Sequence, residues 1–183
     1  PRVAATPETV KKFKTLGADV VVAPGAGIAS GILDAEFAAA GATLSADAKD
    51  ADIVLKVRRP TDAEISTYQK GAIVAAIMDP YGNDAALNAL AKAGVVAFAM
   101  ELMPRITRAQ SMDILSSQSN LAGYKAVLDA AAEYGRAFPM MMTAAGTVSA
   151  AKVFVMGVGV AGLQAIATAR RLGAQVSATD VRS

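Results

Sequence analysis

Residues 152–162 read KVFVMGVGVAG, and this stretch decides the fold. A short, mostly apolar run of the kind that forms a buried strand ends at Met156 and is followed at once by glycines in the spacing G-x-G-x-x-G. Residues 160–172 continue as a helix-forming segment, and residues 175–179 form a second strand-like run. Strand, glycine turn, helix and strand in this order predict one unit of a parallel α/β sheet.

The glycine turn also predicts a dinucleotide-binding site. Gly157 allows the tight turn, Gly159 lets the backbone approach a pyrophosphate, and Gly162 lets the helix pack closely on the strand. The start of the helix would offer backbone N–H groups and a positive dipole end to the phosphates. The alternative is a turn in which the glycines serve packing only. The cofactor-binding positions predicted here are Gly157, Val158, Gly159, Val160, Ala161 and Gly162.

Asp180 follows at the spacing expected for the acidic residue that binds the adenosine ribose. Its carboxylate would accept a hydrogen bond from the 2′-hydroxyl and repel a 2′-phosphate, which favours NAD over NADP. Val181 and Arg182 complete this end of the predicted site. Arg182 leaves NADP open, because a nearby arginine can receive a 2′-phosphate. If the turn serves packing only, Asp180 is a surface residue.

The rest of the chain continues the alternation of strands and helices. A helix is expected to begin after Thr6, and others cover 34–40 and 83–93; strands cover 19–23, 53–57, 72–77 and 95–99. A long helix over 119–138, stopped by Pro139, bridges to the segment with the glycine turn. We predict an α/β fold of two Rossmann-like parallel-sheet domains: an N-terminal domain (1–115) lacking its first strand, a linking helix (116–139) and an incomplete dinucleotide-binding domain (140–183). Two parallel strands and one helix cannot cover both faces of a sheet, so we expect the native protein to be longer at both ends.

Composition limits the chemistry. The chain has 183 residues, a formal charge of +2, and neither cysteine nor histidine, which excludes thiolate chemistry and a histidine proton shuttle. We expect no metal site, and no nucleic-acid partner because the basic residues form only short clusters. Residues 153–169 approach the length of a membrane span. Their patterned glycines, with Gln164 and Thr168, favour a buried strand, turn and helix instead.

A polar segment, residues 100–124, lies between an apolar strand and the long helix and reads MELMPRITRAQSMDILSSQSNLAGY. If residues 110–117 are helical, Gln110, Asp113 and Ser117 share a face, with Ser116 one turn from Asp113. Such amide, carboxylate and hydroxyl groups suit a carboxamide and a ribose. Serine and aspartate are equally common where a helix is capped, so the spacing leaves both interpretations open.

The run from Arg105 to Tyr124 resembles the signature of the NAD(H)-binding domain, the soluble domain I of the alpha subunit, of proton-translocating NAD(P) transhydrogenases. The resemblance extends over residues 2–8, 137–147, 157–169 and 178–182, and so covers essentially the whole chain. It implies that Arg105 and Gln110 lie at the reacting nicotinamide ring and that Asp113 and Ser116 hold the carboxamide and ribose. These four are the catalytic candidates, and Tyr124 is expected close to the site.

The resemblance implies an oxidoreductase in which NADH bound here passes a hydride to NADP⁺ held on a partner domain. A membrane domain of the same enzyme would couple this step to proton translocation. The implied assembly is a homodimer on the cytoplasmic side of a bacterial inner membrane, or on the matrix side in mitochondria. Hydride transfer between two nicotinamides needs orientation and no acid or base, which suits a chain without histidine.

Alanine dehydrogenase is the nearest alternative, a more distant resemblance carried by Arg2 and Lys56, which match positions that bind the keto acid there. Those enzymes also use a catalytic histidine, whereas the matching place here, Met78-Asp79-Pro80, has none. Lys56 can equally belong to a solvated rim with Arg58 and Arg59. A third possibility is an NAD-binding fragment without catalytic activity.

Overall fold

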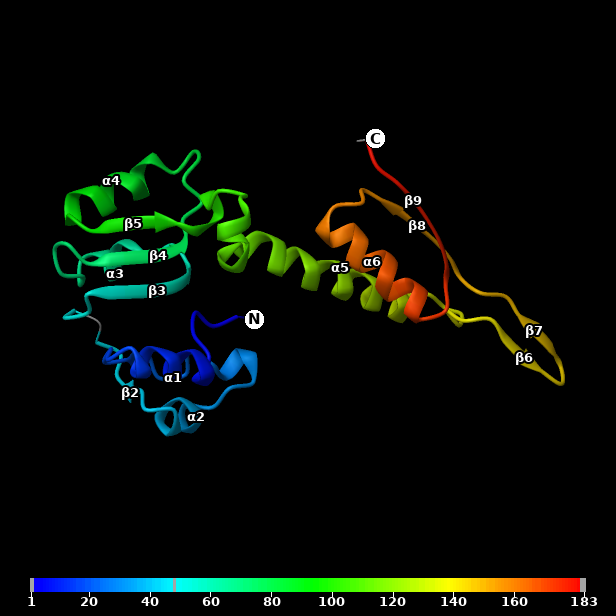
Figure 1. The fold of residues 1–183 in the computed structure, drawn as a ribbon, viewed down its shortest axis with the longest axis horizontal. Helices are drawn as coiled ribbons and strands as arrows, with labels where there is room; N and C mark the ends of the chain where they lie inside the picture. Colours follow the sequence, from blue (N-terminus) through cyan, green and yellow to red (C-terminus); the bar gives the residue numbers. More distant parts are fainter. Residues whose placement is uncertain (1, 48, 182–183) are drawn as a thin grey trace. The chain divides into compact units, whose positions relative to one another are not determined.

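The computed structural model describes residues 2–47 and 49–181. The chain divides into two compact units, Pro1–Pro104 and Arg105–Ser183, which are described separately (Figure 1). Arg182, predicted above as part of the ribose site, lies outside the described residues.

The N-terminal unit begins with α1 (Pro7–Thr15), which Thr6 caps by accepting a hydrogen bond from the Thr9 backbone N–H at 3.3 Å. This cap and the proline in the first turn confirm the predicted helix start. The expected strand over 19–23 is only β1 (Val21–Val22), which pairs in parallel with the unpredicted β2 (Thr43–Leu44). Between them lie η1 (Ile28–Ser30) and α2 (Asp34–Ala39). A small core closes this part: Val10, Val22, Phe37, Ala40 and Ala42.

A second sheet in this unit has the parallel order β3-β4-β5 (Figure 1). Its strands are β3 (Ile53–Arg58), β4 (Ile73–Ile77) and β5 (Val96–Ala99), close to the predicted bounds. Two helices connect them, α3 (Asp62–Ile65) and α4 (Asp84–Ala93), and η2 (Met100–Leu102) follows β5. The predicted alternation of strand and helix is confirmed here. The core consists of Ile65, Val74, Ala76, Met78 and Leu90.

The C-terminal unit begins with η3 (Thr107–Met112) and the long helix α5 (Ile114–Glu133). The predicted bounds 119–138 were wrong at both ends. The helix begins five residues earlier because Asp113 caps it, and it ends at Tyr134, which leaves the helical conformation. The Tyr134 ring contacts the Phe138 ring edge to face, and Phe138 is buried in the core. The chain therefore leaves the helix early enough to bury an aromatic side chain.

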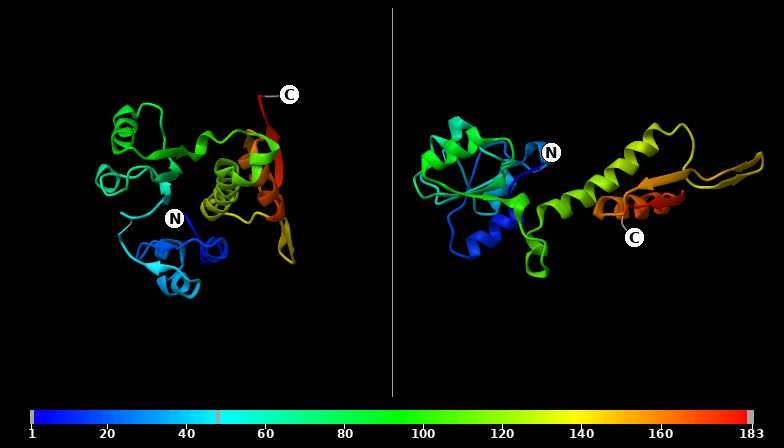
Figure 2. Two further views of the ribbon diagram at one scale, coloured as in Figure 1. Left: turned by 60° about the vertical axis from the view of Figure 1, so that its left-hand side comes forward. Right: turned by 90° about the horizontal axis from the view of Figure 1, so that it is seen from above.

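A hairpin follows α5 and was not predicted. Strands β6 (Met141–Thr143) and β7 (Gly146–Val148) pair antiparallel, and every residue in them is exposed. Figure 2 shows the hairpin extending away from the rest of its unit.

The predicted strand, turn, helix and strand are confirmed. Strand β8 (Lys152–Met156) pairs in parallel with β9 (Gln175–Thr179), and α6 (Val160–Arg171) connects them. The core of this unit comprises Val127, Phe138, Ala151 and Ala169. Across residues 2–47 and 49–181, no helix has the length and apolar character needed to cross a membrane.

Candidate functional site

The turn between β8 and α6 is shaped by two of its glycines. Gly157 has φ +93°, a conformation that favours glycine, and its N–H donates to the Thr179 carbonyl at 2.8 Å. A Cβ on Gly162 would lie well under 3.0 Å from the Gly157 carbonyl oxygen, so a side chain there would collide with the turn itself. A Cβ on Gly159 would meet no atom within 4 Å. Two glycines are thus needed for the fold, and the third leaves its backbone open to approach.

The start of α6 fits an anion. Gly159 is its N-cap and has no side chain to offer, and within the described residues of the chain no side chain caps this helix end. The N–H groups of a first helical turn have no partner within the helix. With the positive end of the helix dipole they suit a phosphate, which is the fit that a dinucleotide requires.

Asp180 lies at the mouth of this turn. Its Oδ2 accepts a hydrogen bond from the Val158 backbone N–H at 2.6 Å, and the residue is half-buried. Its carboxylate is thus held beside the glycine turn, at the end of β9. Val181 follows and is fully exposed.

Asp113 is the N-cap of α5. Its Oδ1 accepts from the backbone N–H groups of Leu115 at 3.0 Å and Ser116 at 2.9 Å, and its Oδ2 accepts from the Ser116 hydroxyl at 2.7 Å. Hydrogen bonds from the Ser116 N–H and hydroxyl, with that from Leu115 and the nearby Arg105 cation, lower the pKa of Asp113. The carboxylate therefore stays ionised at neutral pH.

The expectation of one helix through 110–117 was wrong. Gln110 lies in the 3-10 helix η3, and Asp113 adopts an extended conformation between η3 and α5. An aspartate that caps a helix must itself leave the helical conformation, and this separates Gln110 from the helical face of α5.

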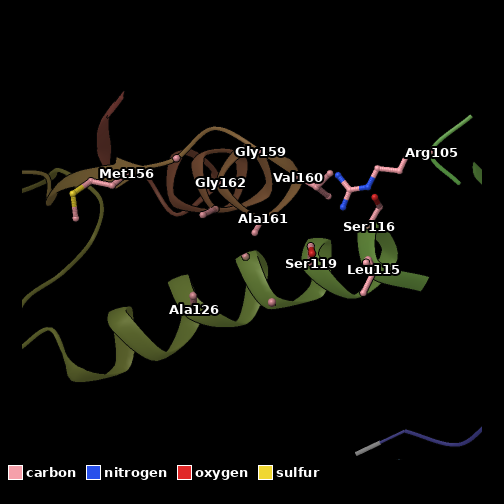
Figure 3. Close-up of a pocket in the computed structure, with 14 residues that line it drawn as sticks. Arg105, Leu115, Ser116, Ser119, Ala126, Met156, Gly159, Val160, Ala161 and Gly162 are labelled. Carbon is pink, nitrogen blue, oxygen red and sulfur yellow. The ribbon is translucent and has the colours of Figure 1, made fainter. Parts of the chain in front are cut away.

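An open groove of about 600 Å³ runs between α5 and the glycine turn, entirely within the C-terminal unit (Figure 3). Arg105, Ser116 and Val160 lie at one end of it in Figure 3. The structure thus brings two of the four catalytic candidates together with the glycine turn. Among the described residues that line the groove, the predicted positions are Arg105, Ser116, Gly157, Gly159, Val160, Ala161 and Gly162.

The other predicted residues do not line this groove. Asp113 contacts it only through Ser116, and Val158 and Asp180 lie behind the turn. Gln110 is exposed on η3, and Tyr124 is 46% exposed on α5.

Seven lining residues were missed by the sequence reasoning. Those on α5 follow one another at helical spacing, a pattern that would have identified the groove-facing side once the helix start at Asp113 was known. The missed residues are Leu115, Ser119, Ala122, Gly123, Ala126, Met156 and Ala165.

The residues that carried the alanine dehydrogenase alternative lie in the N-terminal unit and have partners there. Lys56 forms an ion pair with Glu64, which also caps α3 by accepting from the Thr61 N–H at 2.8 Å. Arg59 is not part of a solvated rim: it donates to the carbonyls of Met78 at 2.6 Å and Asp79 at 3.0 Å. Arg2 is exposed.

Metal binding finds no support in the described region of the chain, where no three acidic, histidine or cysteine side chains gather in a way that could hold an ion.

Parallel strands joined through a glycine turn to an uncapped helix, beside a groove, define a Rossmann-like α/β protein of the nucleotide-binding class. Residues 1–122 match the family described as alanine dehydrogenase/PNT, N-terminal domain, and residues 126–183 match its C-terminal domain. The chain belongs to the alanine dehydrogenase/PNT family.

Three relatives show where in the family the similarity is strong. The first of the parts into which the NAD(P) transhydrogenase alpha subunit of Rhodospirillum rubrum is divided is 56% identical over 100% of this chain and 50% of the relative. The crystal structure of transhydrogenase from Sinorhizobium meliloti matches with a TM-score of 0.96 and 71% identity, over 99% of this chain and 55% of that one. Alanine dehydrogenase of Mycobacterium tuberculosis is 34% identical over 98% of this chain and 50% of its own length. The chain spans about half the length of the curated relatives that it matches.

Proposed function

We propose that this chain belongs to the NAD(H)-binding component of a proton-translocating NAD(P) transhydrogenase. In this reaction a hydride passes directly from NADH bound here to NADP⁺ on a partner domain. The observation that carries the proposal is the groove in which Arg105 and Ser116 face the same space as the glycine turn. A groove with an anion-binding end and a polar end matches a molecule with a diphosphate at its centre and a carboxamide ring at one end.

The glycine turn would hold the adenosine half of the cofactor. The first N–H groups of α6, from Val160, Ala161 and Gly162, would donate to the diphosphate. Asp180, held at the turn by the Val158 N–H, would accept from the ribose 2′-hydroxyl, and its negative charge would repel a 2′-phosphate. This pairing supports a preference for NAD(H) over NADP(H).

The start of α5 would hold the nicotinamide half. Asp113 fixes the Ser116 hydroxyl, whose oxygen keeps lone pairs that can accept from a carboxamide. Arg105 would orient the ring from the end of the same groove, with Gln110 nearby on η3 and Tyr124 one helical face away. Bound NADH supplies the hydride, so these residues need only orient the ring and exclude water.

Alanine dehydrogenase activity is disfavoured by the chemistry of the N-terminal unit. Oxidation of an amine needs proton transfers, and the chain contains no histidine. Lys56 is already paired with Glu64, so its charge is partly neutralised before any keto acid arrives.

The partners we propose are the NADP-binding and membrane domains of the same enzyme, and a second copy of this component. The β6–β7 hairpin supports the homodimer, because Met140, Met142 and Val148 leave 60%, 79% and 36% of their surface exposed. Apolar side chains on a projecting hairpin are commonly covered by another protein surface. We place the assembly on the cytoplasmic side of a bacterial inner membrane, or on the matrix side in mitochondria.

The test is a titration of the intact protein with NADH and NADPH, followed by assay of hydride transfer from NADH to an NADP⁺ analogue with the partner domains added. We expect NADH to bind more tightly, and Asp180→Ala to remove most of this preference. Asp129→Ala, which removes an exposed pair with Lys125, is the matched control and should change neither affinity.

Each alternative has its own result in the same assays. NADH oxidation that depends on pyruvate and ammonia would identify an alanine dehydrogenase. NADH binding without either activity would identify a non-catalytic NAD-binding fragment.

A further inference from the structure

We propose that Gly123 is a positioning residue: it lets the backbone of α5 rest directly on the first turn of α6 and so holds the ring-binding end of the groove in register with the phosphate-binding turn. The inference deepens the function proposed above and rests on it.

The contact at Gly123 is between backbones. Gly123 is buried, and a Cβ added to it would lie well under 3.0 Å from the Ala161 carbonyl oxygen and 2.8 Å from the Ala161 carbonyl carbon. Neither atom can move aside by a side-chain rotation. Any larger residue at 123 must therefore push one helix away from the other.

A second close approach continues from the first. Gly162, the residue after Ala161, is the glycine whose Cβ would collide with the Gly157 carbonyl. Helix α5 thus packs on the first turn of α6, and that turn packs on the glycine bend. Small residues let helix backbones approach in this way, and close packing transmits a displacement instead of absorbing it.

Both ends of the groove are tied to this contact. Ser116 precedes Gly123 by two helical turns, roughly 10 Å along the axis of α5. Both residues line the groove, so a shift of α5 at Gly123 carries Ser116 with it.

The glycine turn has anchors of its own. Gly157 N–H donates to the Thr179 carbonyl at 2.8 Å and Val158 N–H to Asp180 at 2.6 Å, and neither bond involves α5. When α5 moves, the phosphate end of the groove should stay and the ring end should shift.

This asymmetry can be measured with two ligands. ADP-ribose has the adenosine, diphosphate and ribose of NADH but lacks the nicotinamide ring. In the intact protein we expect Gly123→Ala to weaken NADH binding about tenfold while ADP-ribose binding changes less than about twofold, and the hydride-transfer rate to fall up to about 100-fold, as for a reacting group misplaced by about 1 Å.

Gly135→Ala is the matched control, because a Cβ at Gly135 would meet nothing within 4 Å. It should change neither affinity. If Gly123→Ala does not fold, Ala165→Val provides a milder wedge: Ala165 lines the groove on α6, and the change adds two methyl groups there. The same split between the two ligands is expected.

Equal losses of NADH and ADP-ribose affinity, or no loss of either, would overturn the inference and leave the proposed function standing. Failure of the unaltered protein to bind either ligand would overturn both.

Discussion

Two turns of this molecule occupy equivalent places, each at the carboxyl end of a parallel strand, and their backbones are satisfied in opposite ways. After β4, the backbone N–H groups of Met78 and Asp79 donate to the Glu101 carboxylate, and their carbonyls accept from Arg59. After β8, Asp180 accepts from Val158, and the first turn of α6 lacks a side-chain cap among the described residues.

The difference teaches which strand end can bind a ligand. In the N-terminal unit, charged side chains of the protein itself take the place that a ligand would fill, and they hold Asp79 at φ 46°, a conformation that non-glycine residues rarely adopt. In the C-terminal unit, glycines keep side chains out and leave helix N–H groups for an anion. The fold offers two candidate edges, and the local side chains select the second.

The largest effect is expected at Gly162. Gly162→Ala places a methyl group against the Gly157 carbonyl, an overpacking that costs about 3 kcal/mol. We expect a lower unfolding temperature and an NADH affinity reduced by roughly 100-fold or more. Thermal unfolding and an NADH titration measure the two. A variant as stable as the parent would contradict the packing role given to this glycine.

Gly159 separates binding from folding. Because a Cβ here meets nothing within 4 Å, Gly159→Ala should leave the unfolding temperature unchanged. A methyl group in the path of the diphosphate should weaken a charge-assisted hydrogen bond of about 1.5–3 kcal/mol, roughly 10- to 100-fold in affinity for NADH. Calorimetry provides the affinity. Unchanged affinity would show that the ligand does not approach this backbone.

The converse result is expected in the N-terminal unit. Glu101→Gln turns a donor toward the N–H of Met78, which is buried, and should destabilise this unit by roughly 1–2 kcal/mol. Chemical denaturation monitors the loss, and NADH affinity should not change. If NADH binding fell as far as in Gly159→Ala, the distinction between the two turns would not hold.

The smallest effect concerns pH. The pKa of Asp113 is lowered from its ordinary value of 3.8, so its contribution to the start of α5 is complete above 3.8 and is lost as pH falls through the folded-state pKa. We expect the hydrogen-exchange protection of the Ser116 amide to be constant from neutral pH to about pH 5 and to fall in stronger acid. Asp113→Asn can still cap the helix but does not titrate there. The same pH profile in both proteins would exclude the carboxylate as the cause.

Strong local patterns made some elements of this structure predictable from sequence. The strands at 152–156 and 175–179 were found because an apolar run and a glycine turn leave few alternatives. The start of α5 was missed because Asp113 was weighed for ligand binding, although aspartate followed by a helical run is also an N-cap signal. The hairpin at 141–148 was missed because its methionines and alanines carry no alternating pattern.

The groove was only partly predictable for a physical reason. Gly157, Gly159 and Gly162 are local to one turn, so their spacing reveals them. The role of Gly123 arises from a contact with Ala161, far away in sequence, and only the packing of two helices reveals it.

A crystal structure of the intact protein with NADH tests the central claim most directly. We expect the diphosphate oxygens within hydrogen-bond distance of the first N–H groups of α6, with the nicotinamide ring beside Ser116 and Arg105. NADH bound at the turn after β4, or with its diphosphate away from the start of α6, would contradict the account.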